Sequence, residues 1–421
     1  MGDIKAKANN PAFYVDNKKQ ELLFTSRRIS LYIIIMMIGI ILSTFVTQSI
    51  TIAWIINLAG LTVFLPYIRY VNIDSVIISF LYILFGGITV FLNNNFIIGD
   101  LKSIGTNVNI FIFPFFLIMT YSLSIRYKFT QLSFINVFQC LSILGVISIV
   151  FSWVMGGSDI LNVYSGLSAY QAKAAGLFYS KNIYGAFVGL TIGADLYLLN
   201  LKSSFNKYNE ESIYLLIVGI KIIAVILSFS RAALLQVFVM IFLYLLLGNS
   251  KSIHKYILLF FTFIVACGLL AFIHSHENLM TFLLNSVLRI DVGDAGREVA
   301  REMAIGKFSD NMLNILFGVG FAGIDVLDID LDNTYLYLWF TGGIPKILFY
   351  IGAILISFRN ILFLKKMYNG FFRVCFAVAG SYLFFAFFES VAVLELGLLN
   401  FLYTLFMFII PITLRKNGFI Y

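Results

Sequence analysis

Apolar runs long enough to cross a membrane recur along almost the whole chain. A helix needs about 20 apolar residues to span a bilayer, and the sequence offers about 12 such runs. They lie at 29–46, 50–68, 73–92, 110–125, 132–153, 174–200, 212–229, 232–247, 255–273, 334–357, 371–388 and 391–411. Because backbone polar groups in lipid must be satisfied within the segment, each run predicts an α-helix. The sequence therefore predicts an all-α polytopic membrane protein.

Composition excludes a soluble domain. Charged residues make up 12% of the chain and hydrophobic residues 60%, whereas about a quarter of the residues in soluble domains are charged. Cys140, Cys267 and Cys375 all lie inside apolar runs, which is typical of small core residues and not of a disulfide framework. The net charge of +8 follows mainly from topology and does not indicate nucleic-acid binding.

Most of the Lys and Arg residues fall in alternate connecting segments, which predicts the orientation. The N-terminal segment 1–28 and the tail 412–421 are then cytoplasmic. Helices occupy 29–273 and 334–411, and one large loop, 274–333, lies on the outer face. The first run is too long for a signal peptide and no cleavage site follows it, so we expect it to be retained.

Several bases break this pattern. Arg289, Arg297 and Arg301 lie in the large loop, and Lys181 and Arg231 lie at the predicted outer ends of spans. A single base there would be interpreted as a headgroup anchor. Several bases from distant segments, on the face where bases are disfavoured, predict an anionic substrate, because the arginine fork matches phosphate oxygens.

Other features leave two interpretations open. Arg297 and Arg301 share one face of a predicted helix at 297–309, which also suits a solvated amphipathic helix. Lys221, in the middle of the run 212–229, is either functional or paired within the bundle. The acidic residues inside or at the ends of spans could be its partners or could line a polar cavity; they are Asp195, Glu389 and Glu395.

Four landmarks in the second half of the chain resemble the superfamily of O-antigen polymerases and O-antigen ligases, which are bacterial membrane glycosyltransferases. The first is Gly176-Leu-Phe-Tyr-Ser-Lys-Asn182, and the second is Ser228-Phe-Ser-Arg231. The third is Gly296-Arg297 followed by Phe317-Gly-Val-Gly320, and the fourth is Asp332-Asn333-x-x-Leu336 with Gly342-Gly343 downstream. Each landmark is short, and their order and spacing make the combination specific.

The resemblance implies a GT-C-like fold of about 12 helices and a donor glycan on undecaprenyl pyrophosphate. It implies that an acceptor sugar hydroxyl displaces the lipid pyrophosphate, with Arg231 and Arg297 stabilising the leaving group. Asp332 is the predicted base, with Glu298 and Asp294 as alternatives. The further substrate-binding residues are Arg301, Arg289, Lys181, Asn182, Asn333 and Glu298.

The same resemblance implies metal-independent transfer without a cofactor, in the bacterial inner membrane. The loop sequence Asp328-Ile-Asp330-Leu-Asp332 imitates the start of a calcium loop, but Asn333 and Trp339 occupy positions that require glycine and glutamate. Membrane lipid and a chain-length regulator protein are the expected partners, and nucleic acid is not.

Two rival functions remain at this stage. A ligase would transfer the glycan to lipid A core, and ligases carry a histidine where this chain has Asp332. A lipid-linked oligosaccharide flippase would also have about a dozen spans, and such transporters more often show internal repeats, which the sequence lacks. The sequence therefore favours an O-antigen polymerase at the periplasmic face.

Overall fold

The computed structural model describes most of the predicted spans. The described ranges are 27–43, 50–67, 73–92, 131–164, 177–178, 180–204, 208–228, 230–248, 312–319, 333–389, 391–394 and 397–417, with Pro114, Phe115, Ile118, Met119, Ser122, Glu302, Ile305 and Gly306. Within these residues the regular structure is entirely helical. An all-α architecture is therefore confirmed for the described part of the chain.

The helices of the first half follow the apolar runs. After the helix at 27–43, the elements are α3 (Ile50–Leu61), the short helix Thr62–Tyr67, α4 (Ile73–Leu92), α7 (Gln131–Tyr164), α8 (Lys181–Ser204), α9 (Tyr208–Leu227) and α10 (Arg231–Leu246). The predicted spans 110–125 and 255–273 lie wholly or largely outside the described residues, so the count of about 12 stays a prediction.

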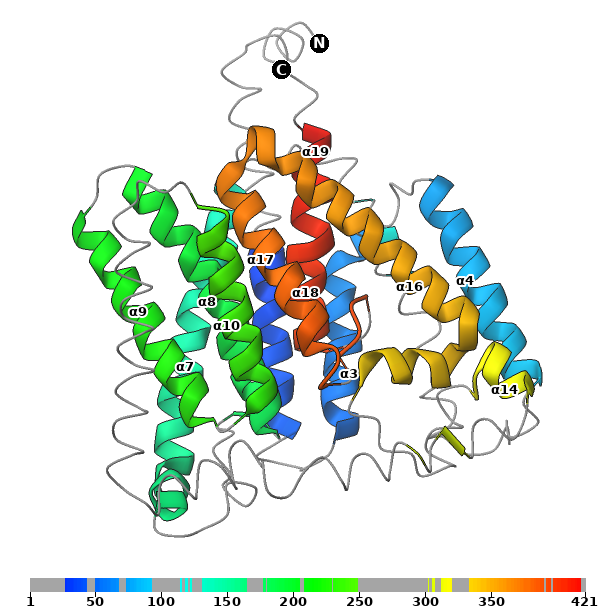
Figure 1. Cartoon of the computed structure of the whole chain (residues 1–421), viewed down its shortest axis with the longest axis horizontal. Helices are drawn as coiled ribbons and strands as arrows, with labels where there is room; N and C mark the ends of the chain where they lie inside the picture. Colours follow the sequence, from blue (N-terminus) through cyan, green and yellow to red (C-terminus); the bar gives the residue numbers. More distant parts are fainter. Residues whose placement is uncertain are drawn as a thin grey trace, which may run out of the picture.

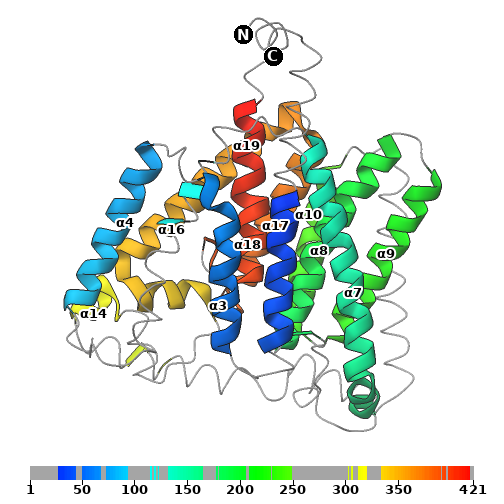
Figure 2. The same ribbon diagram turned by 180° about the vertical axis from the view of Figure 1, so that it is seen from behind.

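The second half contains α14 (Met312–Phe317), α16 (Thr334–Met367), α17 (Asn369–Phe385), α18 (Leu398–Thr404), a π-helical turn (Leu405–Ile409) and α19 (Ile410–Asn417). Among the described residues, four stretches are long and apolar enough to cross a membrane: Phe134–Met155, Lys181–Leu201, Thr334–Met367 and Leu398–Arg415. Figures 1 and 2 show these helices side by side in one bundle.

Burial distinguishes the central helices from the peripheral ones. In α8 and in the stretch Leu398–Arg415, 89% of the most apolar part is buried inside the protein, whereas in α16 the buried share is 33%. The outer face of α10 presents Phe238, Phe242 and Leu246, each more than half exposed. Exposed apolar stripes of this kind suit contact with lipid.

Three glycines on α8 allow neighbouring helices to approach closely. Gly185, Gly189 and Gly193 recur every four residues, so they share one face. A Cβ on Gly189 would lie 2.8 Å from a methyl carbon of Val237 on α10, and one on Gly193 would lie 3.1 Å from Val378 on α17. The central position of α8 therefore depends on these small residues.

Several predicted spans need correction. The span 132–153 continues to Tyr164, and the helix predicted at 174–200 begins at Lys181. The span 391–411 begins only at Leu398, because residues 391–394 are not helical although they are apolar and buried. The span 334–357 continues to Met367 and bends at Gly343, which has a φ of 64°. In Figure 1 the first part of α16 runs along the lower edge of the bundle and the rest climbs across it.

The π-helical turn before α19 has a local cause. Pro411 has no amide hydrogen, so the carbonyl of Met407, four residues earlier, loses its helical partner. The hydroxyl of Ser357 on α16 donates a hydrogen bond to that carbonyl at 2.8 Å. The last helix is thereby joined to α16 at the point where its own hydrogen bonding is interrupted.

Candidate functional site

The N-terminal ends of α8, α10 and α16 converge at one end of the bundle, which we refer to as the polar end. A Cβ on Gly185 of α8 would lie 2.8 Å from Ser228 Oγ and 2.7 Å from the Cβ of Ala233. The two helices therefore cross within about one turn of their first residues. Those first residues are Lys181 and Arg231.

The opposite end, the basic end, contains bases predicted to be cytoplasmic. Arg373, near the start of α17, donates to Asn200 Oδ1 of α8 at 3.2 Å and lies 4.2 Å from the centre of the Tyr244 ring. Arg415 on α19 donates to Asn360 Oδ1 of α16 at 2.6 Å. Since α8 runs from Lys181 to Asn200 between the two ends, the bundle separates Lys181 and Arg231 from these bases by about the thickness of a membrane.

The Ser-x-Ser-Arg landmark is a helix cap. Ser230 is the N-cap of α10, and its hydroxyl accepts a hydrogen bond from the backbone nitrogen of Ala233 at 3.3 Å. Ser228 Oγ accepts from the nitrogen of Ser230 at 3.3 Å and donates to the carbonyl of Val225 at 2.6 Å. Both hydroxyls are buried. They hold the turn that presents Arg231, which is half-buried, as the first residue of α10.

Asn182 and Glu389 connect α8 to the segment that follows α17. The amide Nδ2 of Asn182 donates to Glu389 Oε1 at 2.5 Å. The backbone carbonyl of Glu389 accepts from Thr334 Oγ1 at 2.6 Å, at the start of α16. Asn182, which was predicted as a site residue, therefore meets Glu389 and the fourth landmark at the polar end.

Asn333 fixes the start of α16. Its Oδ1 accepts from the backbone nitrogens of Tyr335 at 2.9 Å and Leu336 at 3.1 Å, as an N-cap does. Its Nδ2 donates to the carbonyl of Phe387 at 3.0 Å. The side chain thus ties α16 to the segment that contains Glu389, and in the described structure it orients backbone.

Glycines join the third landmark to the fourth. Gly318, just after α14, has a φ of 79°, and a Cβ there would lie 2.6 Å from the backbone nitrogen of Gly342. A Cβ on Gly343 would lie 2.3 Å from the carbonyl oxygen of Leu316. The backbone nitrogen of Val319 donates to the carbonyl of Phe340 at 2.7 Å. Side chains at these positions would separate α14 from α16, which explains why both landmarks contain glycine.

Sequence reasoning did not single out Lys346 for the site. This lysine is buried on α16, and its Nζ donates to Thr341 Oγ1 at 2.9 Å and lies 5.3 Å from the centre of the Tyr337 ring. Its position inside an apolar run was the available signal, because a charged group there is costly. Lys346 adds a third cation to the half of the molecule that contains Lys181 and Arg231.

The remaining predicted site residues lie outside the described residues. They are Arg289, Arg297, Arg301, Glu298 and Asp332, and their roles stay predictions. Of the predicted helix 297–309, the described residues Glu302, Ile305 and Gly306 are helical. The structure therefore connects Lys181, Asn182, Arg231 and Asn333 through one end of the bundle and leaves the loop arginines untested.

The charge inside the bundle is paired. Lys221 of α9 and Asp195 of α8 are both fully buried, and Lys221 Nζ lies 2.5 Å from Asp195 Oδ2. Gly145 of α7 leaves room for the pair, because a Cβ there would lie 2.8 Å from Lys221 Nζ. Of the two interpretations of Lys221, the structure supports pairing within the bundle.

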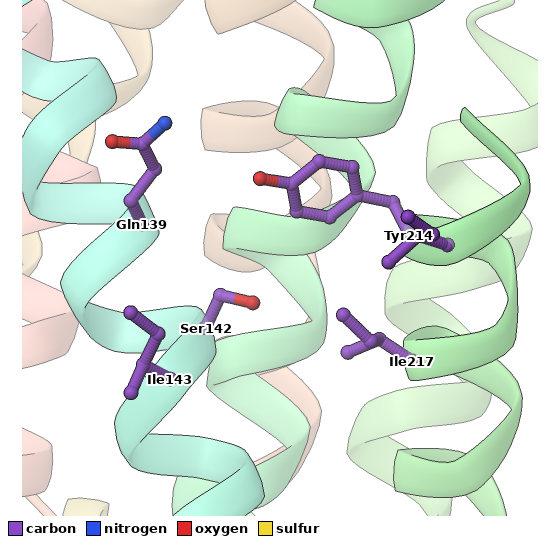
Figure 3. A pocket seen from close by; sticks show the side chains of 6 residues that line it. Gln139, Ser142, Ile143, Tyr214 and Ile217 are labelled. Carbon is purple, nitrogen blue, oxygen red and sulfur yellow. The ribbon is translucent and has the colours of Figure 1, made fainter. Parts of the chain in front are cut away.

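A pocket of ≈ 360 Å³ lies between α7 and α9, beside this pair (Figure 3). Its walls are Gln139, Ser142, Ile143, Ile213, Tyr214 and Ile217. Ser142 lies one turn before Gly145, the glycine that faces Lys221 Nζ. The pocket is lined by residues from the first half of α7 and the first half of α9, and the first half of α9 lies away from the polar end.

Comparisons with protein-family models and with curated proteins find no match to this chain. The resemblance to the O-antigen polymerase and ligase superfamily accordingly rests on its four landmarks. What the structure contributes is their arrangement: the described residues of all four belong to one connected set of contacts.

Proposed function

We propose that this protein is a membrane glycosyltransferase that joins lipid-pyrophosphate-linked oligosaccharide repeat units into a polysaccharide, as O-antigen polymerases do. The polar end would face the periplasm, and the donor would be carried on undecaprenyl pyrophosphate. The remaining parts of the site would come from the loop 274–333, including Arg289, Arg297 and Arg301. Transfer would need no metal and no cofactor.

One observation carries this proposal: the described parts of the four landmarks are linked by contacts at one end of the bundle, although Gly296, Arg297 and Asp332 lie outside the described residues. Asn182 from the first landmark binds Glu389, which binds Thr334 next to the fourth. Gly185, three residues after the first landmark, lies against Ser228 of the second, and Gly318 of the third lies against Gly342 of the fourth.

The electrostatics of the polar end suit a pyrophosphate. The N-terminal end of a helix has a partial positive charge, and natural helices favour acidic residues there. Neither α8 nor α10 has an acidic residue in its first turn, and each begins with a cation. Placing a cation at a helix N-terminus costs about 0.3–1 kcal/mol, and a bound anion would remove that cost. In the transfer step the same charges would stabilise the departing lipid pyrophosphate.

The glycan pattern of a deletion strain tests the proposed function. Loss of a polymerase should leave single repeat units on the cell surface, because the units still cross the membrane and still reach their acceptor. Accumulation of polymer on the lipid carrier would instead indicate a ligase. Retention of lipid-linked units on the cytoplasmic side would indicate a flippase, and either of these outcomes would refute the proposal.

A further inference from the structure

The segment between α17 and α18 is an irregular backbone buried inside a membrane protein. Val391, Ala392, Val393 and Leu394 are each at most 8% exposed and are not helical. Non-helical backbone at membrane depth is tolerated where protein surrounds it or where it lines a polar cavity. Such a segment has to be held by specific partners, and this one is.

Side-chain hydroxyls from three helices satisfy its backbone. Thr334 Oγ1 accepts from the nitrogen of Val391 at 2.9 Å, and Tyr382 Oη donates to the carbonyl of Val391 at 2.7 Å. Thr404 Oγ1 accepts from the nitrogen of Leu394 at 2.9 Å. Leu394 has a φ of 63°, which is a strained conformation for leucine. Strained, over-determined backbone of this kind is concentrated at functional sites.

Glu389 stands where this segment leaves α17, and both its carboxylate and its backbone are fixed. Asn182 binds the carboxylate at 2.5 Å, and Thr334 binds the carbonyl at 2.6 Å. The nitrogen of Glu389 donates to the carbonyl of Phe385 at 3.1 Å. Glu389 is half-buried.

A second observation points to a ligand beside Glu389. Tyr403 of α18 packs against Tyr382 with ring centres 4.5 Å apart, and the Tyr382 hydroxyl binds the carbonyl of Val391, two residues after Glu389. The Tyr403 hydroxyl is fully buried and has no hydrogen-bond partner among the described residues. A buried polar group left without a partner is destabilising. A sugar hydroxyl bound next to Glu389 would provide that partner.

We propose that Glu389 is the general base of the transfer reaction, which rests on the proposed function above. The Glu389 carboxylate takes the proton of an acceptor sugar hydroxyl while that oxygen bonds to the anomeric carbon of the donor. The bond from the anomeric carbon to the pyrophosphate oxygen breaks, and its electron pair leaves with the lipid pyrophosphate. The proton then passes from Glu389 to water. Asn182 is a positioning residue that holds the carboxylate.

The test measures polymerisation by purified protein in liposomes containing lipid-linked repeat units, as a function of pH. Glu389→Gln keeps the hydrogen-bond acceptor for Asn182 and removes the basic group. We expect kcat to fall by about 10²–10⁴-fold, KM for the donor to stay near its wild-type value, and the loss of rate at low pH to disappear. Glu389→Asp should recover part of the rate. Among the described residues, the charged or titratable side chains on the elements that contact this segment include Lys181, Tyr335, Tyr382 and Tyr403.

Glu211 provides the matched control. It is a buried glutamate at the start of α9, at the opposite end of that helix from the polar end. Glu211→Gln should keep the wild-type pH profile. Tyr403→Phe should raise KM for the acceptor unit and leave the pH profile unchanged.

Each result separates this inference from the proposed function. If wild-type protein forms no polymer, the proposed function fails. If wild-type protein polymerises and Glu389→Gln retains both the rate and the low-pH loss, Glu389 is not the base. The same conclusion follows if Asp332→Asn, and not Glu389→Gln, removes the low-pH loss. Binding of the lipid-linked donor by Glu389→Gln shows that the variant is folded.

Discussion

Two kinds of charged residue in this membrane protein are accommodated differently. Lys221 and Asp195 neutralise each other inside the bundle at 2.5 Å, with neither side chain exposed. Lys181 and Arg231 begin helices at one end, where the helix dipole opposes them. The first arrangement suits a structural role, and the second suits an anionic ligand.

The buried pair predicts a large effect on stability. Lys221→Met leaves the Asp195 carboxylate buried without its cation, and we expect the free energy of unfolding to fall by about 3–5 kcal/mol. The double variant Lys221→Met with Asp195→Leu should be more stable than either single variant. Thermal unfolding in detergent measures this, and additive losses in the double variant would show that the two residues do not interact.

Arg231 predicts an effect on activity without a comparable effect on stability. Arg231→Ala should lower kcat/KM for the lipid-linked donor by about 10²–10³-fold, because one preorganised donor to the leaving group is lost. Arg231→Lys should be intermediate, since lysine keeps the charge without the fork. Lys365→Ala, which removes an exposed cation at the basic end, is the control. Equal rates for Arg231→Ala and Lys365→Ala would exclude Arg231 from the site.

For single residues, the sequence indicated which side chains belong to the polar end better than it indicated which of them are in contact. Asn182 was predicted because it ends a landmark, and Arg231 because a base was misplaced. The sequence leaves the role of Glu389 open, because its partner Asn182 is 207 positions away. No local pattern in one sequence indicates such a contact, since it depends on how α8, α16 and α17 pack.

At the scale of elements, glycines set the distances between helices. The face of α8 formed by Gly185, Gly189 and Gly193 permits contact with α10 and α17. The Gly318 and Gly343 joint does the same for α14 and α16. The four-residue spacing on α8 is present in the sequence, but the sequence alone does not identify the helices that these glycines contact.

Substitution of Gly189 tests this packing. Gly189→Leu should lower the free energy of unfolding by about 1–3 kcal/mol, because the added side chain meets Val237. Gly352 on α16 has open space around it, so Gly352→Ala should change stability by less than about 1 kcal/mol. Melting temperatures in the same detergent compare the two. Equal tolerance at both positions would contradict the close contact of α8 with α10.

Hydropathy located most helices and could not locate breaks within them. Residues 391–394 are as apolar as a helix, so the sequence predicted a continuous span there. The structure satisfies their backbone with the hydroxyls of Thr334, Tyr382 and Thr404. The bend at Gly343 was not predicted for the same reason, because hydropathy contains no information about backbone torsion angles.

For the whole molecule, the orientation in the membrane follows from the two ends. Met312 on α14 belongs to the polar end and is 73% exposed, and Lys365 is exposed at the basic end. A membrane-impermeant thiol reagent should label Met312→Cys in intact cells and Lys365→Cys only after permeabilisation, because positive charge is retained in the cytoplasm. The reverse pattern would place the polar end inside the cell and contradict a periplasmic site.

The most direct measurement of the central claim is the length of the glycan made by purified protein in liposomes. Wild-type protein with lipid-linked repeat units should produce a ladder of polymers. A double variant, Lys181→Ala with Arg231→Ala, should be folded and leave the units single, because the cations at the two helix N-termini would no longer hold the pyrophosphate. A full ladder from that variant would show that the polar end does not bind the leaving group.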